Sequence, residues 1–324
     1  MQKHYRRCGR VMAVMLTLLA VMTVTAGRPL AQASISAIVV FGDSLSDTGN
    51  AFAVTREPGV PPDFGLDEFL LPSTAYARGG HHLTNGATWV EQLARPLGLA
   101  RSVQPALRSS SPHALNFAAA TTRARQTLTS PSFSLLVAAF LQKTGGVAPS
   151  DALYAVELGG HDVRDALEVA LVGGNPLPIL QAGADAIGDN IRILYAAGAR
   201  NFLVWTVPDV GRIPAILAIP GASGPATTLT QIFNGLLAAE LADVAGDLPG
   251  INIIPFDAFG LIANIVMNPA QFGLTNVTTA CITPNDPPFF CQNPDEYLFW
   301  DGIHPTEAGH AIIAQAIAQL LGIN

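Results

Sequence analysis

Residues 37–50 read AIVVFGDSLSDTGN, a short apolar run that ends abruptly in glycine, acidic and hydroxyl residues. Apolar runs of this length without polar alternation are typical of parallel strands that are buried on both faces. The segment that follows the run therefore lies at the carboxyl end of a buried strand, where parallel sheets bind their ligands. Comparable runs occur at residues 153–158, 201–207 and 252–256, with a weaker one at 114–117.

Helical periodicity fills the stretches between these runs. Ile187, Ile191 and Leu194 recur at the spacing of one helix face, and so do Phe233 and Leu237. Alternation of strands and helices along the chain predicts an α/β fold, a three-layer α/β/α sandwich around a parallel five-stranded sheet. Since no internal repeat or low-complexity linker interrupts the pattern, residues 34–324 are expected to form a single domain.

The first 33 residues have the pattern of a secretory signal peptide. Lys3, Arg6 and Arg10 precede an apolar run at residues 11–25, and the small-residue tripeptide 31–33 suits a cleavage site. The apolar run is shorter than the roughly 20 residues that span a bilayer as a helix, so no transmembrane anchor is expected. The sequence therefore predicts a secreted or periplasmic protein.

Charge and cysteine content narrow the class further. The 324 residues include 17 basic and 24 acidic side chains, and five of the basic residues lie in the leader, so the mature chain carries 12 − 24 = −12. This balance makes nucleic acid an improbable partner. Cys8 is removed with the leader, which leaves Cys281 and Cys291 as a disulfide pair in an oxidising compartment.

Ser44 follows the first predicted strand, at the expected start of a helix. In that place its hydroxyl and its N–H would face the ligand edge of the sheet. The alternative is a turn of helix-capping residues, for which Asp43, Ser46 and Asp47 are equally suited. The run also differs from the Gly-X-Ser-X-Gly elbow of α/β-hydrolases, because Ser46 stands at the position of the last glycine.

Near the other end of the chain, Asp301 precedes His304 by three residues. At this spacing a carboxylate can accept from one ring nitrogen of the imidazole while the other nitrogen faces a nucleophile. Pro305 favours an extended His304 and suits the first position of the final helix. A capped helix start alone would also explain Asp-X-X-His, but a serine at a strand end in the same chain favours a hydrolytic site.

Four blocks of the sequence together resemble the SGNH (GDSL-type) hydrolase family of lipases and esterases, including its phospholipase/lecithinase/hemolysin-like branch. They are FGDSLSDTGN at 41–50, NGATWVEQLA at 85–94, VWTVPDVGR at 204–212 and FWDGIHPTEAGH at 299–310. The resemblance implies a flavodoxin-like sheet and hydrolysis of acyl esters without a cofactor or metal. It also implies that Ser44 is the nucleophile, His304 the general base and Asp301 its orienting carboxylate.

Two family blocks that form the oxyanion hole match less well. Where the family has a Gly-rich turn, this chain continues from Asn116 through three alanines to Thr121, so that either Ala120 or Thr121 would supply the backbone N–H beside that of Ser44. His161 stands where the family has an asparagine whose amide donates to the oxyanion. A histidine ring also has an N–H to give, whether it works as the neutral or as the protonated form.

The expected partner is a small-molecule or lipid ester, and nothing in the sequence fixes the oligomeric state. Phospholipid deacylation or acyl transfer to another alcohol are alternatives within the same family, and a secreted binding protein without turnover is an alternative outside it. The long loops at 52–85, 211–228 and 267–300 are candidate walls of the pocket, and His81 and His82 in the first of them are expected to be solvated.

Overall fold

The computed structural model describes residues 35–55, 76–107, 109–282 and 289–323, so the predicted signal peptide lies outside the described part of the chain. Its centre is a four-stranded parallel sheet in the order β1-β2-β3-β4. The strands are β1 (Ile38–Gly42), β2 (Leu153–Glu157), β3 (Asn201–Trp205) and β4 (Asn252–Phe256). β1 and β2 are buried throughout, as their apolar runs predict, whereas β4 is an edge strand and carries the exposed Pro255.

The prediction of a fifth strand at residues 114–117 is wrong. This segment runs beside β1, where Val40 donates its N–H to Leu115 and Phe117 donates to Val40, but with β1 it forms only one parallel bridge, between Val40 and Asn116. Asn116 also exchanges backbone hydrogen bonds with residues 104–106 on its other side. The segment is therefore divided between two neighbours and does not extend into a strand.

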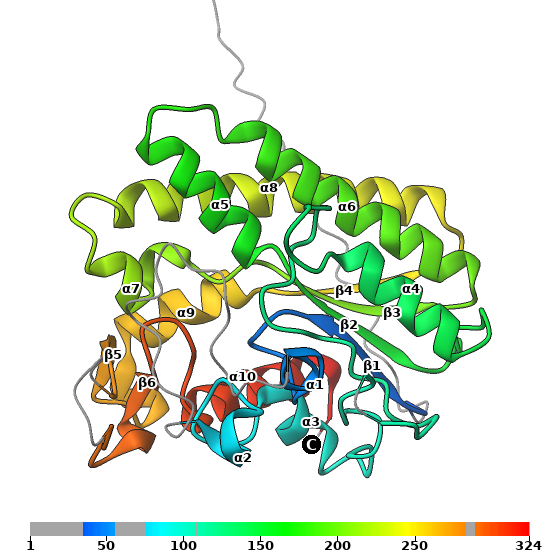
Figure 1. Ribbon diagram of the computed structural model, residues 1–324, viewed down its shortest axis with the longest axis horizontal. Helices are drawn as coiled ribbons and strands as arrows, with labels where there is room; N and C mark the ends of the chain where they lie inside the picture. Colours follow the sequence, from blue (N-terminus) through cyan, green and yellow to red (C-terminus); the bar gives the residue numbers. More distant parts are fainter. Residues whose placement is uncertain (1–34, 56–75, 108, 283–288, 324) are drawn as a thin grey trace, which may run out of the picture.

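Helices cover both faces of the sheet, so the predicted three-layer architecture is confirmed (Figure 1). On one face, Val39, Tyr154 and Phe202 pack against helices α4, α5, α6 and α8. On the other face, Val40 and Leu203 pack against α3 and α10. The helices are α1 (Asn50–Thr55), α2 (Ala77–Gly80), α3 (Trp89–Ala94), α4 (Phe133–Lys143), α5 (Gly160–Leu171), α6 (Leu177–Ala196), α7 (Pro214–Leu217), α8 (Ser223–Asp247), α9 (Ala258–Met267) and α10 (Glu307–Leu321).

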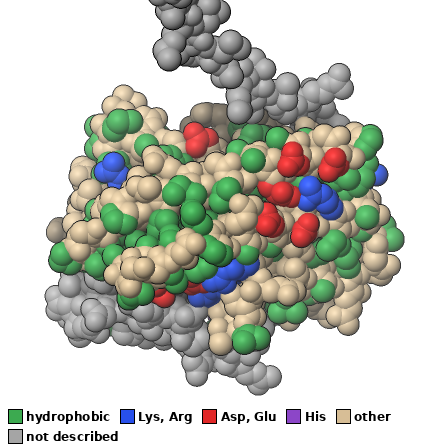
Figure 2. All heavy atoms as spheres, turned by 90° about the horizontal axis from the view of Figure 1, so that it is seen from above, with side chains coloured by type: hydrophobic (Ala, Val, Ile, Leu, Met, Phe, Trp, Pro, Cys, Tyr) green, Lys and Arg blue, Asp and Glu red, His purple; other side chains and the backbone are tan. Residues whose placement is uncertain are grey.

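The longest helices, α6 and α8, pack closely along one side of the molecule. Gly188 allows this approach, because a Cβ at that position would collide with the Glu240 side chain. Arg192 on α6 then pairs with Glu240 on α8 and with Asp189 on its own helix. Figure 2 views the molecule from the side of these helices and shows acidic and basic side chains gathered on an otherwise mixed surface. Of the helices in the described residues, none is both long and apolar enough to cross a membrane.

A small second sheet carries the chain towards its C-terminal loop. Strands β5 (Asn276–Ala280) and β6 (Tyr297–Phe299) are paired in parallel, and the Cys281 N–H donates to the Phe299 carbonyl. Directly after β5, Cys281 and Cys291 form the predicted disulfide. The sequence did not predict this sheet, which fixes the segment immediately before Asp301.

Candidate active site

Ser44 lies in the turn that follows β1, with its side chain almost fully buried. The helix expected to begin at this serine starts later, at Asn50. Asp47 explains the delay, because its carboxylate accepts from the backbone N–H groups of Gly49, Asn50 and Ala51 and so caps the first turn of α1. One residue of this run therefore has the capping role that the alternative interpretation proposed, and Ser44 remains free of that role.

His304 and Asp301 occupy the loop between β6 and α10. Asp301 Oδ1 accepts from the backbone N–H groups of Ile303 and His304, both at 2.7 Å, which closes the loop into a tight turn. Helix α10 begins at Glu307, where the Thr306 hydroxyl caps it by accepting from Gly309, so the prediction that Pro305 is the first helical residue is wrong. The hydroxyl cap explains the later start.

The three predicted triad side chains meet at the end of β1. His304 Nδ1 lies 2.7 Å from Asp301 Oδ2, and His304 Nε2 lies 2.9 Å from Ser44 Oγ. Asp301 and His304 are completely buried. With its Nδ1 proton donated to the carboxylate, the imidazole has Nε2 left to accept from the serine hydroxyl. Such an arrangement can supply a nucleophile, a base and an acid that orients the base.

Thr84 and the NGATW block that follows it hold the loop between β6 and α10 in place. The Thr84 hydroxyl donates to the Pro305 carbonyl at 2.9 Å, and Asn85 Oδ1 accepts from the Glu307 N–H at 2.6 Å. Glu307 in turn accepts from the Ala87 N–H at 3.1 Å. A Cβ at Gly86 would overlap the Glu307 side chain, which explains the glycine in this block. The block therefore fixes the start of α10 and, with it, the loop that carries His304.

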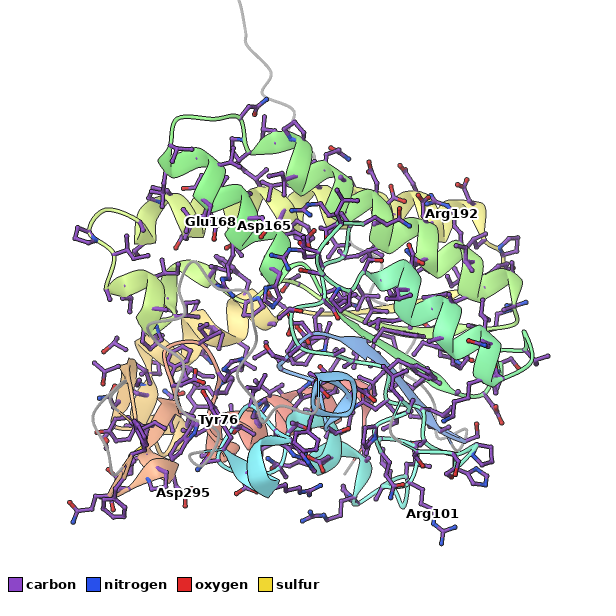
Figure 3. The ribbon with its side chains drawn as sticks, in the orientation of Figure 1. Tyr76, Arg101, Asp165, Glu168, Arg192 and Asp295 are labelled. Carbon is purple, nitrogen blue, oxygen red and sulfur yellow. A yellow bond between two sulfur atoms is a disulfide. The ribbon has the colours of Figure 1, made fainter. Side chains whose placement is uncertain are left out.

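One contact of the triad was not predicted from the sequence. The Tyr76 hydroxyl donates to Asp301 Oδ2 at 2.7 Å, on the same oxygen that faces the His304 ring (Figure 3 labels Tyr76). No local pattern points to this tyrosine, because the two residues are 225 positions apart. His82 was also misjudged, since it is buried rather than solvated and pairs with Glu91 at 2.9 Å. Its glycine-rich neighbours indicated an open loop, but the segment folds back onto α3.

The turn expected to supply an oxyanion donor follows residue 117. Ala120 donates its N–H to Asp47 Oδ2 at 3.0 Å, so that donor is already occupied. Thr121 has a left-handed backbone, with φ of +67°. A β-branched residue rarely adopts this conformation. Thr121 thus keeps a glycine-like backbone at the cost of some strain.

His161 is held at the start of α5 and lines the same pocket as Ser44. Gly159, which precedes the helix, has φ of +112°, and a Cβ there would collide with Phe233 and Val207. His161 is buried, not solvated, and that burial lowers the pKa of its ring well below the usual value, helped by Arg164 and Arg123. At neutral pH the ring is therefore neutral and carries one N–H.

Two further carboxyl groups, those of Asp43 and Glu157, are buried next to Ser44. Glu157 Oε2 accepts from the Asp43 N–H at 3.3 Å and from the Ser46 hydroxyl at 2.9 Å. Burial raises the pKa of Asp43 to about 6 and the pKa of Glu157 well above its usual value. Burial disfavours a negative charge on either acid, and the nearby Asp43 raises the pKa of Glu157 further, so the two groups resist carrying two negative charges together.

A pocket with an interior volume of about 90 Å³ opens beside Ser44 and His161. Of the loops predicted to form its walls, 211–228 contributes Ile213 and 267–300 contributes Phe299. An aliphatic part of the wall comes from α9, α10 and the segment after β3, and consists of Val207, Pro208, Val210, Ala258, Leu261, Ile262 and Ile313. Within the described residues, no group of three or more histidine, cysteine or acidic side chains is arranged to hold a metal ion.

Comparison with known proteins agrees with this geometry. A family model described as GDSL-like Lipase/Acylhydrolase matches residues 38–317, so the chain belongs to the GDSL lipase and acylhydrolase family, as the sequence blocks predicted. The protein named GDSL esterase/lipase At1g23500 of Arabidopsis thaliana is 25% identical over 316 residues, which cover 88% of this chain and 89% of that protein. GDSL esterase/lipase EXL2 of the same plant is 26% identical over 336 residues, 86% of each chain.

Among solved structures, the chain is similar to an extracellular lipase from Streptomyces rimosus. The TM-score is 0.40 at 15% identity, and the match covers 88% of this chain and 99% of the lipase. Membership of the family makes the protein a serine hydrolase that acts on esters.

Proposed function

We propose that the protein is an exported carboxylic ester hydrolase that works through a Ser44-His304-Asp301 triad and an acyl-enzyme. The chief support is the unbroken hydrogen-bonded chain from Ser44 Oγ through both ring nitrogens of His304 to Asp301. Export is supported by the predicted leader and by the Cys281–Cys291 disulfide, which is typical of oxidising compartments.

In the proposed cycle, Ser44 Oγ attacks the carbonyl carbon of the ester while His304 Nε2 accepts its proton. The tetrahedral intermediate collapses, and the alcohol leaves with the proton that His304 returns. Water then attacks the acyl-enzyme, again with His304 as base, which releases the acid and restores the serine. Asp301 keeps the imidazole in the tautomer that presents Nε2 to Ser44 and stabilises the imidazolium.

For the oxyanion we propose the backbone N–H groups of Ser44 and Thr121 together with the neutral ring of His161. Ala120 is set aside because its N–H is donated to Asp47. The aliphatic pocket beside Ser44 suits the acyl chain of the substrate, since burying apolar surface is favourable there at roughly 25 cal/mol per Å².

The test compares the mature protein with Ser44→Ala on p-nitrophenyl esters of increasing acyl length. Ser150→Ala, a change at an exposed serine, is the matched control. We expect turnover in the parent and in the control, and a loss of roughly 10⁵-fold or more in Ser44→Ala. A fluorophosphonate should label the parent at Ser44, as peptide mass spectrometry would report. A folded parent with neither turnover nor labelling would support the alternative of a secreted binding protein.

A further inference from the structure

The triad carboxylate has a partner outside the triad. Tyr76 Oη and Asp301 Oδ2 are 2.7 Å apart, and both side chains are buried. An ionised carboxylate can only accept, so the phenol O–H is the donor. Oδ2 therefore faces two donors, the tyrosine hydroxyl and His304 Nδ1, while Oδ1 is occupied by two backbone N–H groups.

The position of Tyr76 is fixed by packing rather than by this hydrogen bond alone. Its ring belongs to a buried cluster with Leu83, Ala120, Ile282 and Trp300, and the two disulfide cysteines pack against that cluster. The next residue, Ala77, donates its N–H to the carbonyl of Thr84 at 2.9 Å, which connects the tyrosine to the residue directly before the NGATW block. Packing of the tyrosine ring therefore places its hydroxyl against Asp301.

A second donor on Oδ2 has two consequences for the chemistry. It fixes the rotation of the carboxylate, so that Oδ2 stays aligned with the His304 ring. It also withdraws negative charge from the carboxylate oxygen that would face an imidazolium during the reaction. Asp43, His161 and His310 also interact electrostatically with His304, so the contribution of the hydroxyl is the difference between parent and variant.

We infer that Tyr76 is a positioning residue of the hydrolase, whose hydroxyl aligns Asp301 with His304 and extends activity towards acidic pH. The inference rests on the proposed function, because it assigns Tyr76 a role only through those two residues. It commits to a direction, since a purely structural tyrosine would affect stability without moving the pH dependence of the reaction.

The test is the pH profile of kcat/KM for Tyr76→Phe, which keeps the ring and removes only the hydroxyl. We expect the midpoint of the acidic limb to move to higher pH by about half a unit to one unit, and kcat to fall about tenfold. KM should change little, because Tyr76 is not among the residues that line the pocket beside Ser44.

Tyr154→Phe is the matched control, since it removes a buried tyrosine hydroxyl whose acceptor is the Pro149 carbonyl, within the sheet core. It should leave the acidic limb in place. Site-specific 3-fluorotyrosine at position 76 keeps the shape of the side chain and makes a more acidic donor, so the limb should move to lower pH. This second variant decides the matter if Tyr76→Phe does not fold.

An acidic limb that stays at the parent's midpoint in both position-76 variants would overturn the inference. That outcome differs from failure of the proposed function, in which the parent itself shows neither turnover nor fluorophosphonate labelling at Ser44. Turnover in the parent with unmoved limbs would leave the triad in place and reduce Tyr76 to a packing residue.

Discussion

The two halves of the candidate site are held in different ways. In the half that contains Asp301, each carboxylate oxygen has two partners, and the side chains match the family's blocks. In the half that would hold the oxyanion, Thr121 has a left-handed backbone, and His161 stands where the resemblance implies an asparagine. A triad needs particular side chains at particular distances, whereas an oxyanion hole needs only N–H donors, which nearly every residue carries. The oxyanion half of the site can therefore accept more kinds of side chain than the half that contains Asp301.

Apart from replacement of Ser44, Asp301→Asn should cause the largest loss of kcat. An asparagine amide can present an N–H to His304, which stabilises the wrong tautomer, so we expect kcat to fall roughly 10,000-fold. The backbone bonds to Oδ1 can be kept, so the fold should survive.

Asp257→Asn is its control, because the Asp257 side chain also accepts from a backbone N–H, that of Gly260, at the start of a helix but lies outside the proposed triad. Steady-state kinetics and thermal melts of both variants make the comparison. An active Asp301→Asn enzyme would contradict the assigned role of the carboxylate.

His161→Ala should come next. Removal of one oxyanion donor costs about 100- to 1,000-fold in kcat. His161→Asn should keep most of the activity, since an amide N–H also donates. Because burial lowers the pKa of His161 well below its usual value, the ring is neutral in the parent at neutral pH, and the pH profiles of His161→Asn and the parent should superimpose there. A profile that differs between the two would mean that the protonated ring takes part.

Thr121→Gly tests the backbone strain of the second half and should change activity only a few-fold. Glycine removes the Cβ from a left-handed residue and keeps the N–H, so the free energy of unfolding should rise by about 0.5 to 1 kcal/mol. Ala120→Gly is the neighbouring control, because Ala120 is not in the left-handed region and glycine there should destabilise. Equal destabilisation by both substitutions in urea melts would rule out strain at Thr121.

The same contrast explains what the sequence could predict. The four strands and the helices between them follow from local apolar patterns, and the proposed triad rests on two blocks with particular side chains. The partner of Asp301 could not be found in this way, since Tyr76 reaches it through the fold and no periodicity marks it. The selection of Thr121 over Ala120 depends on a backbone angle and on a bond to Asp47, neither of which a sequence displays.

Two predictions from the sequence were wrong because tertiary contacts, which the local pattern does not show, decide the structure of the segment. Residues 114–117 are apolar enough for a strand, but their pairing with β1 competes with residues 104–106. His82 lies among glycines, yet the chain folds back and buries it against Glu91. In both cases a tertiary contact overrode a local pattern that was correct in itself.

The smallest effect on activity is expected at Asp43 and Glu157, the two buried acids next to Ser44. In the unfolded chain Asp43 and Glu157 lose their protons near pH 4, whereas in the folded protein the pKa of Asp43 is about 6 and that of Glu157 is raised well above its usual value. Between these limits the folded state binds more protons, so this pair lowers the free energy of unfolding as pH rises from about 4 to beyond 6. His161 and His310 act in the opposite sense, because burial lowers the pKa of both rings and their neutral forms favour folding as pH rises towards 6.5.

Glu157→Gln separates these opposing contributions. The glutamine amide can accept from Ser46 and donate to Asp43, but it does not titrate. The fall in the free energy of unfolding between pH 5 and pH 8 should therefore be smaller than in the parent. The melting temperature at pH 8 should be higher by about 2 °C, with kcat nearly unchanged. Glu296→Gln, at a surface hydrogen bond with Thr275, should follow the parent at every pH. Parallel melting curves for parent and Glu157→Gln would mean that the pair is ionised like ordinary surface acids, and that the turn under Ser44 tolerates two buried negative charges.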